Sequence, residues 1–229
     1  MEKQFEWLLF DLDNTILDFS VSSKLAFSAV YEALEVDKTL KDVYRLYSGI
    51  NHSVWQEREA GKLSATEVKT KRWSLLCDVL DIEKDASYLN DVYFEGIRKH
   101  VLFVEGAEDV LEQLVGKYRM MIVTNGLSEV QWSRINDTNI QRFFKHIVIS
   151  DEIGIAKPAY KFFDHCAELM GFPAKDKVLV IGDTKMSDIK GGNDFGYYTC
   201  WYNHKQSDQE GPEANFLINS ISELQGLLL

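Results

Sequence analysis

Two kinds of hydrophobic pattern divide the chain. The first consists of short continuous runs of aliphatic, β-branched or aromatic residues, which are typical of strands buried on both faces of a parallel sheet. The runs are WLLFD at 7–11, RMMIVT at 119–124, HIVIS at 146–150, KVLVIGD at 177–183 and YYTCWY at 197–202. Amphipathic helical patterns lie between most of them, at 106–118, 158–172 and 186–196. This alternation predicts an α/β fold, a Rossmann-like parallel sheet with helices on both faces, which a strand at 215–219 and a short helix at 220–229 close.

The second pattern is almost wholly helical and lies between the first two predicted strands. Its clearest stretches are residues 22–36, 54–80 and 86–101. A single connection between neighbouring strands does not need so many residues, because such connections are normally short. We therefore expect an all-helical cap inserted after the first strand, at residues 18–105. The catalytic core is then expected to comprise residues 1–17 and 106–229.

Composition narrows the possible classes of protein. A chain of 229 residues with 45% hydrophobic content can bury a substantial core. No apolar stretch reaches the roughly 18 residues of a membrane span, and the first residues lack a secretory signal, so a cytoplasmic location is expected. Cys77, Cys166 and Cys200 are too widely spaced for a CxxC metal site, and their odd number does not suit a disulfide framework. A net charge of −11 disfavours a nucleic-acid polymer or an anionic membrane as partner.

Polar residues gather at the predicted carboxyl ends of the strands, where ligands bind in open parallel sheets. They are Asp11 and Asp13 after the first strand, Thr124, Asn125 and Gly126 after the second, Lys157 after the third, and Asp183 with Asp188 after the fourth. Neighbouring carboxylates repel one another unless a cation or a proton intervenes. A cluster of Asp11, Asp13 and Asp183 suits Mg²⁺, and Mn²⁺ favours the same oxygen ligands.

These residue types predict phosphoryl transfer. Asp11 is the expected nucleophile, because a carboxylate can attack phosphorus and form an aspartyl-phosphate. Asp13 is the expected general acid, which then acts as the base for the attacking water. Thr124 and the main-chain amides of the Asn125–Gly126 turn can donate hydrogen bonds to phosphoryl oxygens, and Lys157 supplies a fixed positive charge.

The same stretches resemble the four motifs of the haloacid dehalogenase-like hydrolases. The matching stretches are DLDNT at 11–15, VTNG at 123–126, AKP at 156–158 and GDTKMSD at 182–188. The resemblance implies that Asp11 is the nucleophile and that Asp13 is the acid/base whose main-chain carbonyl also ligates Mg²⁺. It further implies that Asp183 completes the metal site, with Asp188 as a supporting carboxylate. Asn14 is a departure, since many members carry glycine there.

Several activities within this family stay open at the level of sequence. Members that attack carbon need no acid at position 13, so Asp13 argues for phosphoryl transfer and makes a carbon–halogen hydrolase the minor hypothesis. A sugar phosphomutase, another small-metabolite phosphatase and a non-catalytic binder of phosphorylated ligands also stay open. The expectation is a Mg²⁺-dependent phosphomonoester hydrolase, which we expect to be a monomer or a small homo-oligomer.

The expected cap offers a more specific resemblance. Residues 51–73 and the 11–19 stretch are similar to pyrimidine 5′-nucleotidases, which implies a small phosphorylated metabolite, a nucleoside 5′-monophosphate, as substrate. Phe19 and Trp55 are candidates for stacking on a base, as is Trp73, while Gly126 is a candidate for substrate contact. Aromatic residues at helical spacing more often belong to a core.

Overall fold

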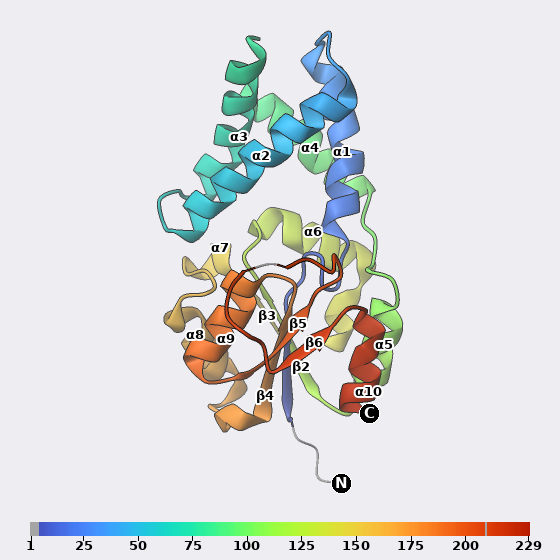
Figure 1. The fold of residues 1–229 in the computed structure, drawn as a ribbon, viewed down its shortest axis with the longest axis vertical. Helices are drawn as coiled ribbons and strands as arrows, with labels where there is room; N and C mark the ends of the chain where they lie inside the picture. Colours follow the sequence, from blue (N-terminus) through green and yellow to red (C-terminus); the bar gives the residue numbers. More distant parts are fainter. Residues whose placement is uncertain (1–4, 209) are drawn as a thin grey trace. The chain divides into compact units, whose positions relative to one another are not determined.

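The computed structural model describes residues 5–208 and 210–229 and divides into two compact units (Figure 1). The α/β unit contains the described residues up to Asp18 together with Leu102–Leu229, and the helical unit is Phe19–Val101. Each unit is described by itself below. The assignment of the two units as catalytic core and cap stays a prediction.

A parallel sheet forms the centre of the α/β unit. Within the described residues its order is β3-β2-β1-β4-β5-β6, and every neighbouring pair is parallel. The strands are β1 (Trp7–Phe10), β2 (Arg119–Thr124), β3 (His146–Ile149), β4 (Val178–Gly182), β5 (Tyr198–Tyr202) and β6 (Phe216–Ile218). All residues of β1 and β4 are buried, as the continuous apolar runs predict. The predicted α/β class is confirmed.

Helices connect the strands and cover both faces of the sheet (Figure 1). They are α5 (Ala107–Leu114), α6 (Ser128–Thr138), α7 (Ser150–Ile153), α8 (Tyr160–Met170), α9 (Lys190–Phe195) and α10 (Leu224–Leu228). The shorter turns are η1 (Ile140–Phe143), η2 (Lys175–Lys177), the π-helical η3 (Lys185–Ile189) and η4 (Ile221–Glu223). The predicted helix at 186–196 is therefore divided between η3 and α9.

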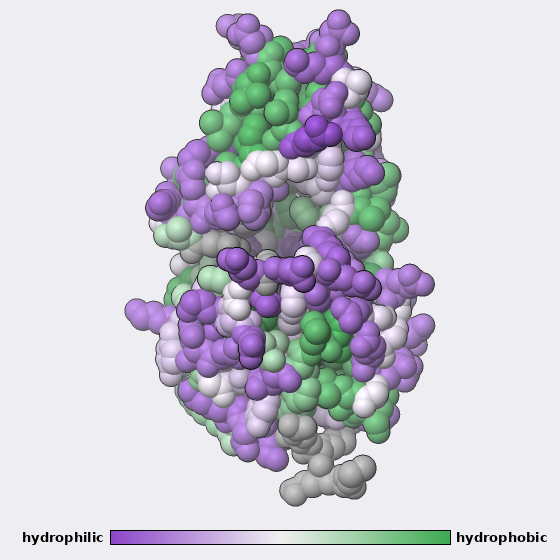
Figure 2. All heavy atoms as spheres, in the orientation of Figure 1, coloured by the Kyte–Doolittle hydropathy of each residue, from purple (hydrophilic) through white to green (hydrophobic). Residues whose placement is uncertain are grey.

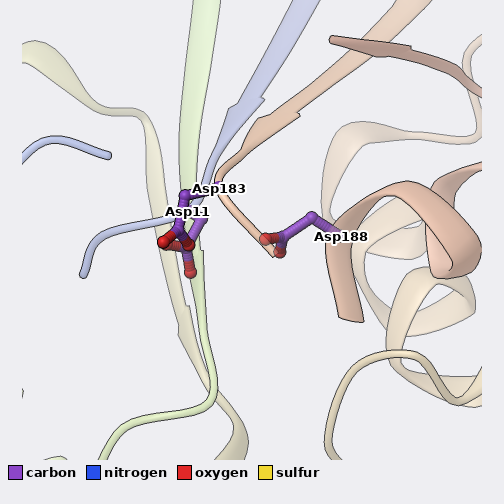
Figure 3. Close-up of side chains that lie close together, drawn as sticks. All are labelled: Asp11, Asp183 and Asp188. Carbon is purple, nitrogen blue, oxygen red and sulfur yellow. The ribbon is translucent and has the colours of Figure 1, made fainter. Parts of the chain in front are cut away.

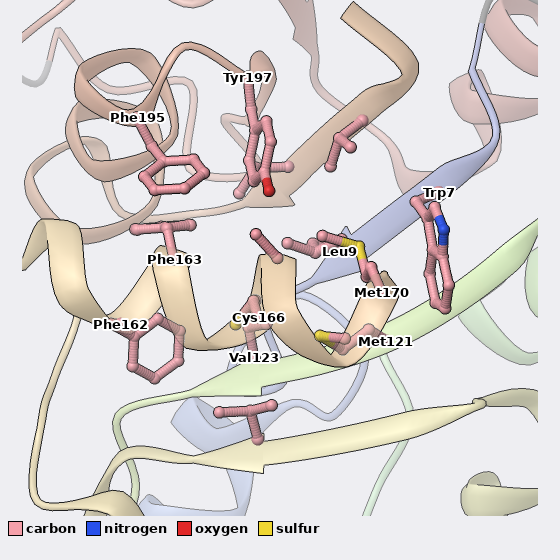
Figure 4. Packing of buried hydrophobic residues seen from close by; sticks show 14 residues of the cluster. Trp7, Leu9, Met121, Val123, Phe162, Phe163, Cys166, Met170, Phe195 and Tyr197 are labelled. Atoms are coloured by element: carbon pink, nitrogen blue, oxygen red, sulfur yellow. The ribbon is translucent and has the colours of Figure 1, made fainter. Parts of the chain in front are cut away.

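One face of the sheet packs against α8 and α9 (Figure 4). Alternate strand residues such as Trp7 and Leu9 of β1 point to this face, where they join Phe163 and Met170 of α8. Side chains alternate between the two faces of a strand, so Leu8 and Phe10, which are equally buried, point to the opposite face. Because the central strands are covered on both faces, their ends are held in fixed positions.

The helical unit contains α1 (Phe19–Leu34), α2 (Leu40–Glu59), α3 (Ala65–Leu80) and α4 (Ala86–Lys99). Its core is aromatic: the ring centroids of Tyr47 and Trp73 lie 4.7 Å apart in a stacked pair, and Phe27 stacks on Tyr47. The predicted helical stretch at 54–80 is broken between α2 and α3. Ser64 and Glu67 form a capping box that starts α3, because each side chain satisfies a main-chain N–H of the other.

The outer face of the α/β unit carries many hydrophilic side chains. Hydrophilic side chains cover much of the face of the α/β unit that Figure 2 presents. No helix in the described part of the chain is long and apolar enough to cross a membrane. Cys77, Cys166 and Cys200 are free thiols and are buried.

Candidate active site

The strand register brings the carboxyl ends of β1, β2 and β4 to one edge of the sheet. Phe10 of β1 pairs with Ile122 of β2 on one side and with Ile181 of β4 on the other. The main-chain N–H of the next residue, Asp11, donates to the carbonyl of Ile181 at 2.9 Å, so Asp11 emerges where β4 also ends. Thr124 is the last residue of β2.

Lys157 is the centre of the site. Its side chain is 1% exposed, and its Nζ donates to Asp11 Oδ1 at 2.7 Å, Asp188 Oδ1 at 2.6 Å and the carbonyl of Val123 at 2.7 Å. Burial favours the neutral amine, but the negative charges of Asp11 and Asp188 outweigh it and raise the pKa of Lys157. Lys157 is therefore a permanent ammonium that joins the segments after β1 and β4 to the end of strand β2 at Val123.

Asp11 is a buried carboxylate in an acidic neighbourhood. Its Oδ1 accepts from Lys157, and its Oδ2 accepts from the hydroxyl of Thr15 at 3.2 Å. Burial raises the pKa of Asp11, and repulsion from Asp188 and Asp183 adds to this, while Lys157 acts in the opposite direction. A second positive charge beside Asp11 would hold it in the anionic form that a nucleophile needs.

Asp11, Asp183 and Asp188 lie together at this edge (Figure 3). One carboxylate oxygen from each lies within 4.8 Å of the others. Asp188 reaches the cluster from η3, where its Oδ2 accepts from the N–H of Thr184 at 3.1 Å. Once ionised, the three carboxylates exceed the single charge of Lys157 by two negative charges. This all-oxygen donor set and its charge fit a divalent ion such as Mg²⁺.

Asp13 has different partners. Its carboxylate pairs with the guanidinium of Arg134 through Nη1, and its Oδ2 accepts from Gln131 Nε2 at 2.8 Å. The carboxylate of Asp13 therefore does not belong to the group of three above, and its predicted part in a metal site stays a prediction. Asn14, the next residue, has a φ of 62°, a left-handed conformation that asparagine adopts more readily than most residues. This conformation is the physical reason why glycine also suits the position.

The segment after β2 is tied to Lys157 by the side chain of Asn125. Its Oδ1 accepts from the N–H of Lys157 at 2.8 Å, and its Nδ2 donates to the carbonyl of Lys157 at 2.9 Å. We predicted that the Asn125–Gly126 turn donates to a phosphoryl oxygen. The Asn125 side chain has both of its polar groups on the main chain of Lys157, so the prediction concerns the main-chain amides alone. Of these, the N–H of Gly126 donates to Thr124 Oγ1.

Thr124 Oγ1 accepts two hydrogen bonds, from the N–H of Gly126 at 3.2 Å and from Gln131 Nε2 at 2.8 Å. Its own hydroxyl hydrogen is therefore directed elsewhere and can serve as a donor. Gly126 is also a packing requirement, since a Cβ there would lie 2.3 Å from Gln131 Nε2. Gln131 and Arg134 were not predicted as site residues.

Three residues beside Asp183, on β5, on η3 and after β5, were not singled out in the sequence analysis. The indole N–H of Trp201 donates to the carbonyl of Asp183 at 3.0 Å, which fixes the main chain that carries this carboxylate. Lys185 Nζ lies 4.2 Å from the centroid of the Trp201 ring. His204 Nε2 lies 3.9 Å from Asp183 Oδ2. A tryptophan within an apolar run gives no signal of this role in the sequence.

The aromatic candidates for base stacking all belong to the helical unit. Phe19 is the first residue of α1 and Trp55 lies on α2, and both are partly buried. Their role in substrate binding stays a prediction. Trp73 is fully buried in the aromatic core of the helical unit, as the helical spacing of the aromatic residues favoured.

Comparison with known proteins agrees with this geometry. The family model described as haloacid dehalogenase-like hydrolase matches residues 8–202. The Bacillus subtilis HAD-hydrolase YfnB is 34% identical over 99% of this chain and 96% of its own, and the Escherichia coli pyrimidine 5′-nucleotidase YjjG is 30% identical over 98% of both chains. The crystal structure of YfnB bound to magnesium superposes with a TM-score of 0.89 over 99% of both chains. The chain therefore belongs to the haloacid dehalogenase-like hydrolases.

Proposed function

We propose that this protein is a Mg²⁺-dependent phosphatase that hydrolyses nucleoside 5′-monophosphates through an aspartyl-phosphate. The observation that carries the proposal is the contact of Lys157 with both Asp11 and Asp188, which gathers segments distant in the sequence around one carboxylate nucleophile. The similarity to YjjG and to the Streptococcus pneumoniae pyrimidine 5′-nucleotidase PynA, which is 30% identical over 96% of this chain, supports the nucleotide substrate.

Each step of the reaction has a residue with suitable chemistry. An oxygen of Asp11 attacks phosphorus, the bond from phosphorus to the ester oxygen breaks, and Asp13 gives its proton to the departing oxygen. Asp13 then takes a proton from the water that attacks the aspartyl-phosphate, which releases inorganic phosphate and restores Asp11. Lys157 and the Thr124 hydroxyl stabilise the charge on the phosphoryl oxygens.

Asp11, Asp183 and Asp188 are the side chains that would hold Mg²⁺, together with the main-chain carbonyl of Asp13. When bound, this ion would neutralise the excess negative charge and polarise a phosphoryl oxygen. Asp13 supports phosphoryl transfer over carbon–halogen hydrolysis, because the alcohol of a phosphate ester departs as an alkoxide that needs a proton. No observation favours the phosphomutase hypothesis.

The test is a phosphate-release screen over pyrimidine and purine nucleoside monophosphates, sugar phosphates and small phosphoesters, each with Mg²⁺ and with a chelator. We expect nucleoside 5′-monophosphates to be turned over, and activity to vanish in chelator and in Asp11→Asn. Normal turnover by a folded Asp11→Asn variant would refute the aspartyl-phosphate. If phosphorus NMR shows that a sugar phosphate is converted into an isomer without phosphate release, the protein is a mutase instead.

A further inference from the structure

Helix α6 carries two polar residues where an amphipathic helix normally carries apolar ones. Gln131 and Arg134 are 1% and 0% exposed, and they lie three residues apart, on the same face of the helix. Val130 and Ile135 are buried beside them. Complete burial of a guanidinium is costly unless its charge is paired and hydrogen-bonded. The fold thus accepts a costly arrangement at this place.

Both side chains are directed at Asp13. The Nη1 of Arg134 pairs with Asp13 Oδ1, while Gln131 Nε2 donates to the other oxygen, Oδ2, at 2.8 Å. The two helix residues are also bonded to each other, since Arg134 Nη1 donates to Gln131 Oε1 at 2.9 Å. Two oxygens held by two donors fix the rotation of the carboxylate as well as its position.

The same network reaches the phosphate-binding side of the site. Gln131 Nε2 donates its second hydrogen bond to Thr124 Oγ1 at 2.8 Å. One amide group therefore sets the separation between the expected general acid and the hydroxyl expected to hold the phosphoryl group. Gly126 allows this arrangement, because any Cβ at that position would displace the Gln131 amide.

The exposure of the three side chains distinguishes support from chemistry. The side chain of Asp13 is 28% exposed, whereas that of Arg134 is 0% exposed and Gln131 is buried. Asp13 can therefore contact a substrate while its two supports cannot be reached by one. Groups that transfer protons must be held within a fraction of an ångström of their productive geometry, and buried supporting residues supply this rigidity.

We propose that Gln131 and Arg134 are positioning residues that hold the Asp13 carboxylate for proton transfer to the departing ester oxygen. This inference rests on the proposed phosphatase function. It assigns α6 a role in catalysis without substrate contact, and it makes Gln131 the link between the acid of the first motif and the threonine of the second.

The experiment compares two substrates that differ in their need for an acid. An alkyl ester such as a nucleoside 5′-monophosphate needs protonation of its departing oxygen, while p-nitrophenyl phosphate releases a stable phenolate and needs little. Arg134→Met keeps the side-chain volume and removes the charge. We expect it to lower kcat/KM for the nucleotide by about 100-fold and for p-nitrophenyl phosphate by less than about tenfold. We expect Arg134→Lys to recover part of the loss.

Two further variants complete the test, one at the second supporting residue and one as a matched control. Gln131→Met leaves Arg134 in place and should give a smaller loss, about tenfold, with the same preference for p-nitrophenyl phosphate. Arg142→Met makes the same chemical change at an arginine whose carboxylate partner, Glu108 on α5, lies outside the site. Its kcat/KM should stay within about twofold of the wild-type value for both substrates.

The outcomes separate this inference from the proposed function. Equal losses on both substrates would mean that α6 only supports the fold, and unchanged or increased nucleotide turnover in both Arg134→Met and Gln131→Met would mean that the contacts do not aid proton transfer. Either result overturns the inference while the wild type remains active. A wild type that hydrolyses neither substrate with Mg²⁺ overturns the proposed function and the inference together.

Discussion

Replacement of Lys157 by methionine removes the positive charge that directly contacts both Asp11 and Asp188. Their oxygens lie 2.7 and 2.6 Å from Nζ, and the side chains of Lys157 and Asp188 are each 1% exposed. At an effective dielectric constant of about 20, each contact is an attraction of about 6 kcal/mol, which desolvation of the ions opposes. Loss of one partner from a buried ion pair costs about 3–5 kcal/mol, because the remaining charge is left uncompensated. We expect Lys157→Met to lower the free energy of unfolding by this amount.

The assay is urea denaturation in a chelator, followed by tryptophan fluorescence and circular dichroism. The two units can unfold in separate steps, so the change is measured on the step that the variant shifts. Adding Asp188→Asn to Lys157→Met removes one uncompensated charge and should recover about 1–3 kcal/mol. Lys175→Met is the matched control, since Lys175 donates to the main-chain carbonyl of Phe195 and should contribute about 1 kcal/mol or less.

The reasoning fails if Lys157→Met changes the free energy of unfolding by less than about 1 kcal/mol, or if the double variant is simply additive. Either result would show that the buried charges are compensated by something other than Lys157. Mg²⁺ should narrow the difference in the free energy of unfolding between the wild type and Lys157→Met. A bound cation favours the native state and offsets the negative charge of the same carboxylates.

Three further results are expected. Asn125→Ala should lower the free energy of unfolding by about 1–3 kcal/mol in urea denaturation, because it removes two hydrogen bonds to the main chain of Lys157, and an unchanged midpoint would contradict this. Gly182→Ala should destabilise by about 1–3 kcal/mol, because its Cβ would lie 2.3 Å from the Cγ of Asp188; a wild-type melting temperature would refute that packing. Burial raises the pKa of Cys200 to about 12, so only about 10⁻⁴ of this thiol is thiolate at pH 8. Alkylation of Cys200 in the native protein, followed by mass spectrometry, should therefore be slow at pH 8 and about tenfold faster for each pH unit up to that pKa. Rapid labelling at pH 8 would contradict the burial of Cys200.

The strands could be predicted from sequence because they are buried on both faces. Each central strand is then a continuous apolar run, and the polar residues that follow it mark its carboxyl end. This is why Asp11, Thr124 and Asp183 could be assigned to one edge of the sheet from the sequence alone. Register pairing of Phe10 with Ile122 and Ile181 supplies the physical basis for that expectation.

The direction of individual side chains could not be predicted in the same way. Asn125 and Asp13 each lie in a motif of the family, so the sequence places them near the reacting groups. Their partners are far along the chain: 32 residues separate Asn125 from Lys157, and 121 separate Asp13 from Arg134. The role of Trp201 is harder still to predict from the sequence. Its indole N–H donates to the main-chain carbonyl of Asp183, while its ring fits the apolar pattern of β5.

The absence of α6 from the predicted helices has the same origin as its proposed role. A helix is recognised in a sequence by an apolar stripe, and the buried positions of α6 are Val130, Gln131, Arg134 and Ile135. Half of that stripe is polar, so the periodic signal is lost. Asp13 supports both residues in the interior, since it pairs with Arg134 Nη1 and accepts from Gln131, and Gln131 also donates to Thr124. A polar interruption on the buried face of a helix that directly follows a catalytic motif is thus itself a pointer to supporting residues. Suppose that Gln131→Met and Arg134→Met each raise the free energy of unfolding above the wild-type value while they lower nucleotide turnover. These two positions would then show that the fold gives up apolar packing to orient one carboxylate.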